Sequence, residues 1–111
     1  MNIDQKCVGT CVVVTVSGRL DASTAPEAEK VLTESMAAAE PRLVLDLAGV
    51  DYVSSAGLRV LLATAKRVKR ERGRLVLCGL QEQVREVLEM SGMLPLFTVA
   101  ADEAAAVEQA G

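Results

Sequence analysis

Residues 42–78 decide the fold, and they read RLVLDLAGVDYVSSAGLRVLLATAKRVKRERGRLVLC. The mostly apolar runs 42–47 and 75–78, at the two ends of this stretch, have the length and texture of buried central strands. Between them, apolar residues recur at the three-to-four spacing of one buried helix face: Leu58, Leu61, Leu62, Ala65 and Val68. Gly73 is the expected breaker of this helix. A helix that connects two strands of one sheet makes them parallel, so the stretch predicts a right-handed βαβ unit.

Two strands and a helix are predicted before this unit. Residues 11–16 are rich in β-branched side chains and predict a strand that Gly18 ends, and a weaker strand precedes Gly9. If these two strands pair through a turn at Gly9, the sheet begins antiparallel. Thr24-Ala25-Pro26-Glu27 then predicts a helix that starts with a capping box, and Pro41 stops it.

Three shorter elements are predicted after the unit. They are a helix that carries Val84, Val87 and Leu88, a strand at 96–99, and an Ala-rich terminal helix capped by Asp102. Two strands followed by alternating helices and strands predict an α/β fold with a mixed sheet, in one domain over residues 1–111.

Several kinds of chemistry lack the residues that they need. The chain has no histidine, so neither a Ser-His-Asp nor a Cys-His site can be built, and its three cysteines cannot supply the four Cys/His ligands of a structural zinc. It contains no phosphate-binding glycine loop of the GxxxxGK[ST] or GxGxxG type. Tyr52 and Phe97 are the only aromatic residues, too few for a platform that stacks single-stranded nucleic acid. We therefore expect a non-enzymatic protein without cofactor, metal or nucleic-acid partner.

The sequence also predicts a cytoplasmic location. Residues 1–6 lack the basic cluster and apolar core of an export signal, and no apolar run approaches the length of a membrane-spanning helix. Cys7, Cys11 and Cys78 are odd in number and form no CxxC motif, which favours reduced thiols. With a net charge of −3, the chain has no general attraction to nucleic acid or anionic lipid, so a protein is the expected partner and no membrane insertion is expected.

A basic cluster surrounds the end of the central helix, and its members are Lys66, Arg67, Lys69, Arg70, Arg72 and Arg74. Cations complement the negative end of a helix dipole, so a solvated helix end is favoured over a docking patch. Phosphate binding at this cluster stays open as an alternative.

The turn at residues 51–58 carries the strongest functional signal. A buried strand there hands over to the central helix, whose first amides are unpaired and attract an anion. A serine at this place is first of all an ordinary helix cap. Capping needs only one serine, so it leaves either Ser54 or Ser55 without a role. It also does not explain the small residues Ala56 and Gly57, which would let another surface approach closely.

Four blocks of sequence, taken together, resemble the stand-alone STAS domains of the anti-sigma factor antagonist family, and the resemblance spans nearly the whole chain. The blocks are Gly18-Arg19-Leu20-Asp21, residues 45–50 (LDLAGV), residues 53–61 (VSSAGLRVL) and residues 84–93 (VREVLEMSGM).

The resemblance implies a mixed sheet with helices packed mainly on one face, and a surface around the turn that binds an anti-sigma factor. In this bacterial family the partner is typically also a serine kinase of the histidine-kinase-like ATPase fold. It phosphorylates a serine of the turn, which weakens the complex and frees the partner to hold its sigma factor, and a PP2C-type phosphatase removes the mark. The antagonist itself is expected to be a monomer when free.

The resemblance also implies the site residues. The best-known members read Asp-Ser-Ser-Gly-Leu with the phosphoacceptor directly before the glycine, whereas this chain has Ala56 there. We expect Ser55 to be the acceptor, with Ser54 as second choice, because both lie within about one residue of the helix cap. The expected partner-binding residues are Arg19, Asp21, Ser54, Ser55, Ala56, Gly57, Leu58 and Arg59.

Two aspartates also have expected roles. Asp21 is a candidate carboxylate beside the turn serine, with a turn or helix-start role as an equal alternative, and Asp46 is expected to order backbone amides at its strand end.

The rival function is that of a STAS scaffold subunit in a lipid-transport complex, without a regulatory phosphate. A small enzyme that uses Asp21, Asp46 and the serines is the least favoured.

Overall fold

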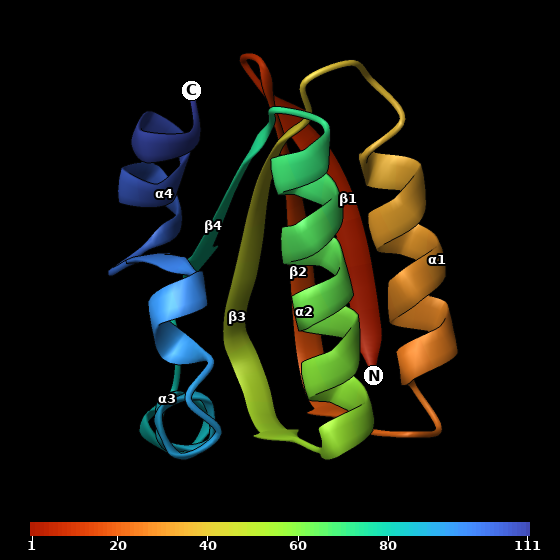
Figure 1. Cartoon of the computed structure of the whole chain (residues 1–111), viewed down its shortest axis with the longest axis vertical. Coiled ribbons are helices and arrows are strands. Elements are labelled where there is room, and N and C mark those ends of the chain that lie inside the picture. The colour runs from red at the N-terminus through yellow and green to blue at the C-terminus, as the bar shows by residue number, and fades with distance from the viewer.

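A computed structural model describes all residues of the chain, 1–111, as a five-stranded sheet with helices on both faces (Figure 1). The strands follow each other across the sheet in chain order: β1 (Asn2–Val8), β2 (Cys11–Leu20), β3 (Arg42–Val53), β4 (Arg74–Cys78) and β5 (Thr98–Ala100). The helices are α1 (Ala25–Ser35), α2 (Ser55–Arg70), α3 (Glu82–Met90), the short 3₁₀ helix η1 (Leu94–Leu96) and α4 (Glu103–Ala110). Only β1 and β2 pair antiparallel, and the other neighbouring strands are parallel. The predicted α/β fold with a mixed sheet is confirmed.

The helices lie mainly on one face of the sheet, as expected. Helices α1 and α2 lie side by side, with α2 in front of the strands (Figure 1), and α3 shares their hydrophobic core. The alternation along β3 explains the two layers, because Leu43, Leu45 and Leu47 belong to this core. Val44, between them, packs on the opposite face with Ala106 and other residues of α4. The helix α4 is therefore the one that covers the other face, and its predicted cap is confirmed by the bond from the Ala105 amide to Asp102 Oδ1 (2.9 Å).

The prediction that Gly18 ends the second strand is wrong. Gly18 takes a left-handed φ of 98°, and the ladder to β3 shifts register nearby, but β2 continues to Leu20. Strand β3 likewise continues to Val53, where Leu20 and Val53 are partners. Both strands thus end at the same edge of the sheet, and this brings the segments that follow them together.

One helix start and one strand differ from the sequence expectation. The capping box at Thr24 does not form, because Thr24 Oγ1 accepts from the Asp21 amide (2.9 Å) and donates to the Arg19 carbonyl (2.8 Å). The side chain of Asp21 accepts from the Thr24 amide instead, at 3.3 Å. The last strand lies at Thr98–Ala100 rather than 96–99, because residues before it form one 3₁₀ turn that contains a proline.

The cysteines give the first testable expectation. All three are free, with Cys7 exposed and Cys11 and Cys78 buried. Burial, followed by the negative charges of Asp46, Glu103 and Asp102, raises the pKa of Cys78 from 9.0 to about 12. Because the thiolate is the reactive form, a brief iodoacetamide pulse near neutral pH should label Cys7 alone in the folded protein and all three cysteines in denaturant, as mass spectrometry can count.

The same thiol should make the stability of the fold depend on pH. Because the folded pKa of Cys78 is raised, its protonated thiol contributes stability that is complete below pH 9.0 and is lost as the pH rises towards about 12. A Cys7→Ser variant is the control and should take up no label while folded. Rapid native labelling of Cys78 would contradict the buried position.

Candidate functional site

The turn between β3 and α2 is fixed by the end of β2. The Ser54 amide donates to the Leu20 carbonyl at 2.9 Å, which ties the first residue after β3 to the last residue of β2. The site residues predicted at 19–21 and at 54–59 therefore lie at the same edge of the sheet.

Ser54 is the cap of helix α2. Its backbone is extended, and its hydroxyl accepts from the Gly57 amide at 3.3 Å, while its carbonyl accepts the Leu58 amide at 2.8 Å. The prediction that one serine caps the central helix is confirmed, and this serine is Ser54. Its hydroxyl thus already has a structural partner.

Ser55 is the first residue of α2 and is exposed. Its hydroxyl makes no hydrogen bond within the chain, and the first turn of α2 contains no acidic residue. The N-terminal amides of this helix provide a partial positive charge beside it. The geometry therefore leaves Ser55 accessible for modification and leaves room in the local electrostatics for an added anion.

Gly57 has a role that differs from the sequence interpretation. It is buried, and a Cβ at this position would lie 2.6 Å from the Leu20 carbonyl oxygen and 3.0 Å from Val53 Cγ1. The missing side chain lets α2 approach the chain's own β2, so the idea that Gly57 makes room for another surface is corrected. Ala56 and Leu58 are half-buried against the same core, and Arg59 is exposed.

Arg19 and Tyr52 form a contact that the sequence analysis missed. They are partners across β2 and β3, and the Arg19 guanidinium lies 4.3 Å from the centre of the Tyr52 ring. Arg19 Nε also approaches Asp21 Oδ2 at 3.6 Å. Tyr52 remains 41% exposed at the end of β3, three residues before Ser55. We call Arg19, Tyr52, Ser55 and Arg59 the switch surface.

A groove extends the switch surface between α1 and α2. It has a volume of about 340 Å³, and Ala56 and Arg59 of α2 face Ala25, Pro26 and Glu29 of α1 across it. The groove reaches Ala56, the residue after Ser55, while Ser55 itself lies outside its lining.

Asp21 holds the loop before α1. Its Oδ1 accepts from the Ser23 hydroxyl at 2.7 Å and from the Ser23 amide at 3.0 Å. These bonds, led by the one from the Ser23 hydroxyl, hold the pKa of Asp21 below its ordinary value of 3.8. The turn role considered for Asp21 is thus present in the structure. Asp46 also has its expected role, since its Oδ1 accepts from the Ala48 amide at 3.0 Å.

The lowered pKa of Asp21 predicts a pH-dependent contribution to stability. Because the folded pKa is lowered, the ionised carboxylate stabilises the fold above pH 3.8, and this contribution is lost as the pH falls through the folded value. An Asp21→Asn variant should therefore unfold at lower denaturant than the wild type near neutral pH, and the two midpoints should converge at acid pH. Midpoints that stay equally far apart at every pH would contradict this role.

Two further properties of the structure concern metal and membrane. No group of three or more His, Cys, Asp or Glu side chains is arranged to hold a metal ion. None of the helices combines the length and the hydropathy that crossing a membrane requires.

Comparisons with known proteins agree on one family. The family model described as STAS domain matches residues 2–106. The chain is 40% identical over 106 residues to BtrV of Bordetella bronchiseptica, provisionally named an anti-sigma factor antagonist, and the match covers 96% of this chain and 91% of BtrV. It is 29% identical over 99 residues to the anti-sigma-B factor antagonist of Staphylococcus aureus, covering 89% and 92% of the two chains. The crystal structure of an anti-sigma factor antagonist from Mycobacterium paratuberculosis superposes with a TM-score of 0.87 at 26% identity, over 98% of this chain and 92% of the other.

Proposed function

Because the chain belongs to the STAS domain family, we propose that it acts as an anti-sigma factor antagonist, a regulatory protein that binds an anti-sigma factor and thereby releases a sigma factor. The names of its relatives support the class of function. The observation that carries the proposal is the exposed hydroxyl of Ser55, which makes no hydrogen bond and lies at the N-terminus of α2.

The proposed partner is an anti-sigma factor that is also a serine kinase of the histidine-kinase-like ATPase fold, in the cytoplasm. It would cover the switch surface and transfer a phosphoryl group from ATP to Ser55, and a PP2C-type phosphatase would remove it. Ser55 is preferred to Ser54 because the Ser54 hydroxyl accepts the Gly57 amide as the helix cap. The antagonist is proposed to be a monomer when free.

The charges around Ser55 support a switch at this residue. Phosphorylation adds about −1.5 to −2 charges, which the amides at the start of α2 accommodate. Arg59 lies four residues further along the helix, on the same face as Ser55, and its exposed side chain is a ready counter-charge. In a complex, the same phosphate would have to lose its water against the partner, so phosphorylation penalises the complex and leaves the free protein folded.

The direct test is phosphosite mapping after incubation with the cognate kinase and ATP. We expect one phosphate on Ser55, none on a Ser55→Ala variant, and continued phosphorylation of a Ser54→Ala variant, which should lose about 1 kcal/mol of stability with its cap. A mark on threonine or on a distant serine would reject the assignment. Co-purification with a membrane transporter in place of a kinase would reject the function itself and favour the scaffold of a lipid-transport complex.

A further inference from the structure

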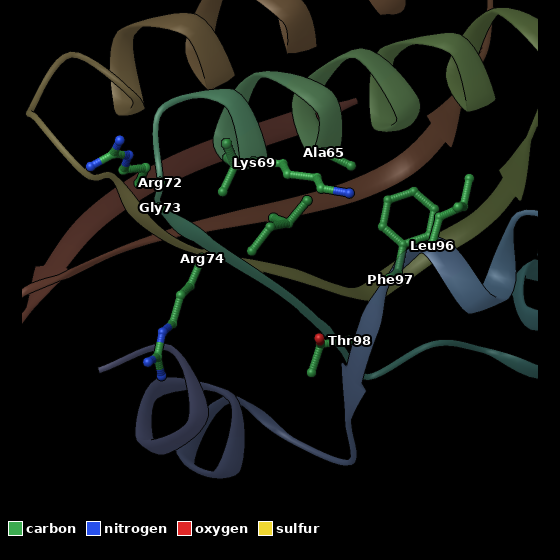
Figure 2. Close-up of a pocket in the computed structure, with 10 residues that line it drawn as sticks. Ala65, Lys69, Arg72, Gly73, Arg74, Leu96, Phe97 and Thr98 are labelled. Carbon is green, nitrogen blue, oxygen red and sulfur yellow. The ribbon is translucent and has the colours of Figure 1, made fainter.

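A second hollow lies at the opposite end of α2 from Ser55. Figure 2 shows it between the C-terminal end of α2, the start of β4 and the segment from η1 to β5. Its volume is about 350 Å³, and we call it the basic pocket. Its lining combines the apolar side chains Ala65, Leu96 and Phe97 with the cationic residues Lys69, Arg72 and Arg74.

The basic pocket lies at the positive pole of an acidic protein. Residues 66–74 contain six of the 12 Lys and Arg residues of the chain and only one of its 15 Asp and Glu residues, a local net charge of +5 in a chain of net charge −3. That one acid, Glu71, is paired with Arg67 at 2.7 Å. No carboxylate lines the pocket, so nothing inside it neutralises the cations.

The cations of the basic pocket differ in whether they already have an ion pair or a hydrogen bond within the chain. Lys69 and Arg72 form no ion pair and no side-chain hydrogen bond, whereas Arg74 donates to the Gln109 carbonyl at 3.3 Å. Figure 2 shows the Lys69 side chain extended across the pocket towards Leu96 and Phe97, with Arg72 reaching outward at the rim. Lys69 is therefore the cation placed over the apolar floor, whereas the Arg72 guanidinium points away from it.

A solvated helix end explains the cations but leaves the exposed apolar surface beside them unexplained. The left-handed φ of 59° at Arg72 belongs to this helix end, because the Gly73 amide donates to the Val68 carbonyl at 2.8 Å and the Arg72 amide to the Lys69 carbonyl at 3.1 Å. Leu96 is 59% exposed beside the cations. A neighbouring hollow of about 390 Å³ continues past Leu96 along α2, between Leu62, Lys66 and Pro95. Cationic and exposed apolar side chains thus line the same concave surface.

We propose that the basic pocket binds a small amphipathic organic anion. Its carboxylate, phosphate or sulfonate group would contact Lys69, and its apolar part would cover Leu96 and Phe97. The Arg72 side chain would turn inward from the rim to join Lys69. The volume lies at the lower end of the roughly 300–1,000 Å³ that ligand pockets enclose. The 16 residues of α2 separate the pocket from Ser55 by roughly 20 Å, so the site goes beyond the proposed function and can be occupied while a partner covers the switch surface.

The test is a titration of the full chain with 1-anilinonaphthalene-8-sulfonate, followed by fluorescence and by amide chemical shifts. We expect saturable binding with the largest shifts at Lys69, Gly73, Phe97 and Thr98. Two further probes separate the parts of the ligand: N-phenyl-1-naphthylamine has the apolar rings without the charge, and inorganic sulfate has the charge without the rings. Both should bind roughly tenfold more weakly than the complete probe, the difference that one charge-assisted hydrogen bond or a buried ring makes.

Matched variants locate the site. The double variant Lys69→Glu with Arg72→Glu should weaken binding of the probe at least roughly tenfold. Lys30→Glu with Arg85→Glu makes the same change of charge at exposed positions elsewhere and should leave binding unchanged, as should Ser55→Glu. Leu96→Ser removes the apolar contact, keeps every charge and should weaken binding as well. Circular dichroism verifies that each variant is folded.

Four results would overturn the proposal. They are equal binding of the probe to both double variants, chemical shifts confined to another surface, equally tight binding of the uncharged or the inorganic probe, and attachment to anionic phospholipid vesicles without binding of the soluble probe. Because each readout uses the chain alone, the proposal can fail while the anti-sigma factor function holds, and the reverse is also true.

Discussion

Ser55→Glu is expected to weaken the complex with the anti-sigma factor roughly a hundredfold, a loss of about 2.7 kcal/mol. The physical reason is the desolvation of a carboxylate at the centre of a covered surface, where the wild type presents a small neutral hydroxyl. The fold should not suffer, because an acidic residue at the first position of α2 interacts favourably with the helix dipole by about 0.3–1 kcal/mol. A loss of binding would therefore report on the interface alone.

Isothermal titration calorimetry with the purified partner measures this effect. Ser55→Ala is expected to bind like the wild type, because it removes a hydroxyl that has no hydrogen bond within the chain. Thr33→Glu adds the same charge at an exposed position near the other end of α1, and it should also bind normally. Equal affinities of the glutamate and alanine variants at Ser55 would refute the switch.

Gly57→Ala is expected to destabilise the protein by about 2 kcal/mol, although alanine favours helices. The new Cβ would lie 2.6 Å from the Leu20 carbonyl oxygen, and that carbonyl cannot move away freely because it accepts the Ser54 amide at 2.9 Å. Relief requires the start of α2 to separate from the end of β2. The same movement displaces Ser55, so partner binding should weaken together with stability.

Denaturant unfolding should show a lower midpoint for Gly57→Ala with an unchanged slope, and a still lower midpoint for Gly57→Val. The control is Gly92→Ala, where no atom lies within 4 Å of the added Cβ and only the left-handed φ of 74° opposes it. This control should lose about 1 kcal/mol and keep normal binding. A Gly57→Ala protein as stable as the wild type would show that α2 is free to move at this point.

The sequence predicted those features that depend on short-range patterns. Apolar spacing located the central helix and the strands around it, because burial on one face leaves a period that neighbouring residues reveal. The caps provided by Ser54 and Asp102 and the turn at Asp46 were also predictable, because short polar side chains bond to amides two or three residues away.

The features that sequence reasoning missed depend on contacts between distant segments. Residues 48–52 are mostly exposed and small or polar, so nothing in their pattern reveals that β3 continues to Val53. The Arg19–Tyr52 contact follows from the register of β2 and β3 after two shifts, which no local pattern encodes. Gly57 was misinterpreted for the same reason, since the surface that it approaches belongs to β2 of its own chain.

The hydrogen bond from the Ser54 amide to the Leu20 carbonyl, together with the contact at Gly57, has a consequence for regulation. A turn held from both sides is preorganised, so it surrenders little conformational entropy when a partner docks. The same rigidity means that adding a phosphate should leave the main chain of the free protein where it was. The phosphate would then control binding through the charge on the surface that the partner contacts. The main chain of the antagonist would have the same conformation with and without the phosphate.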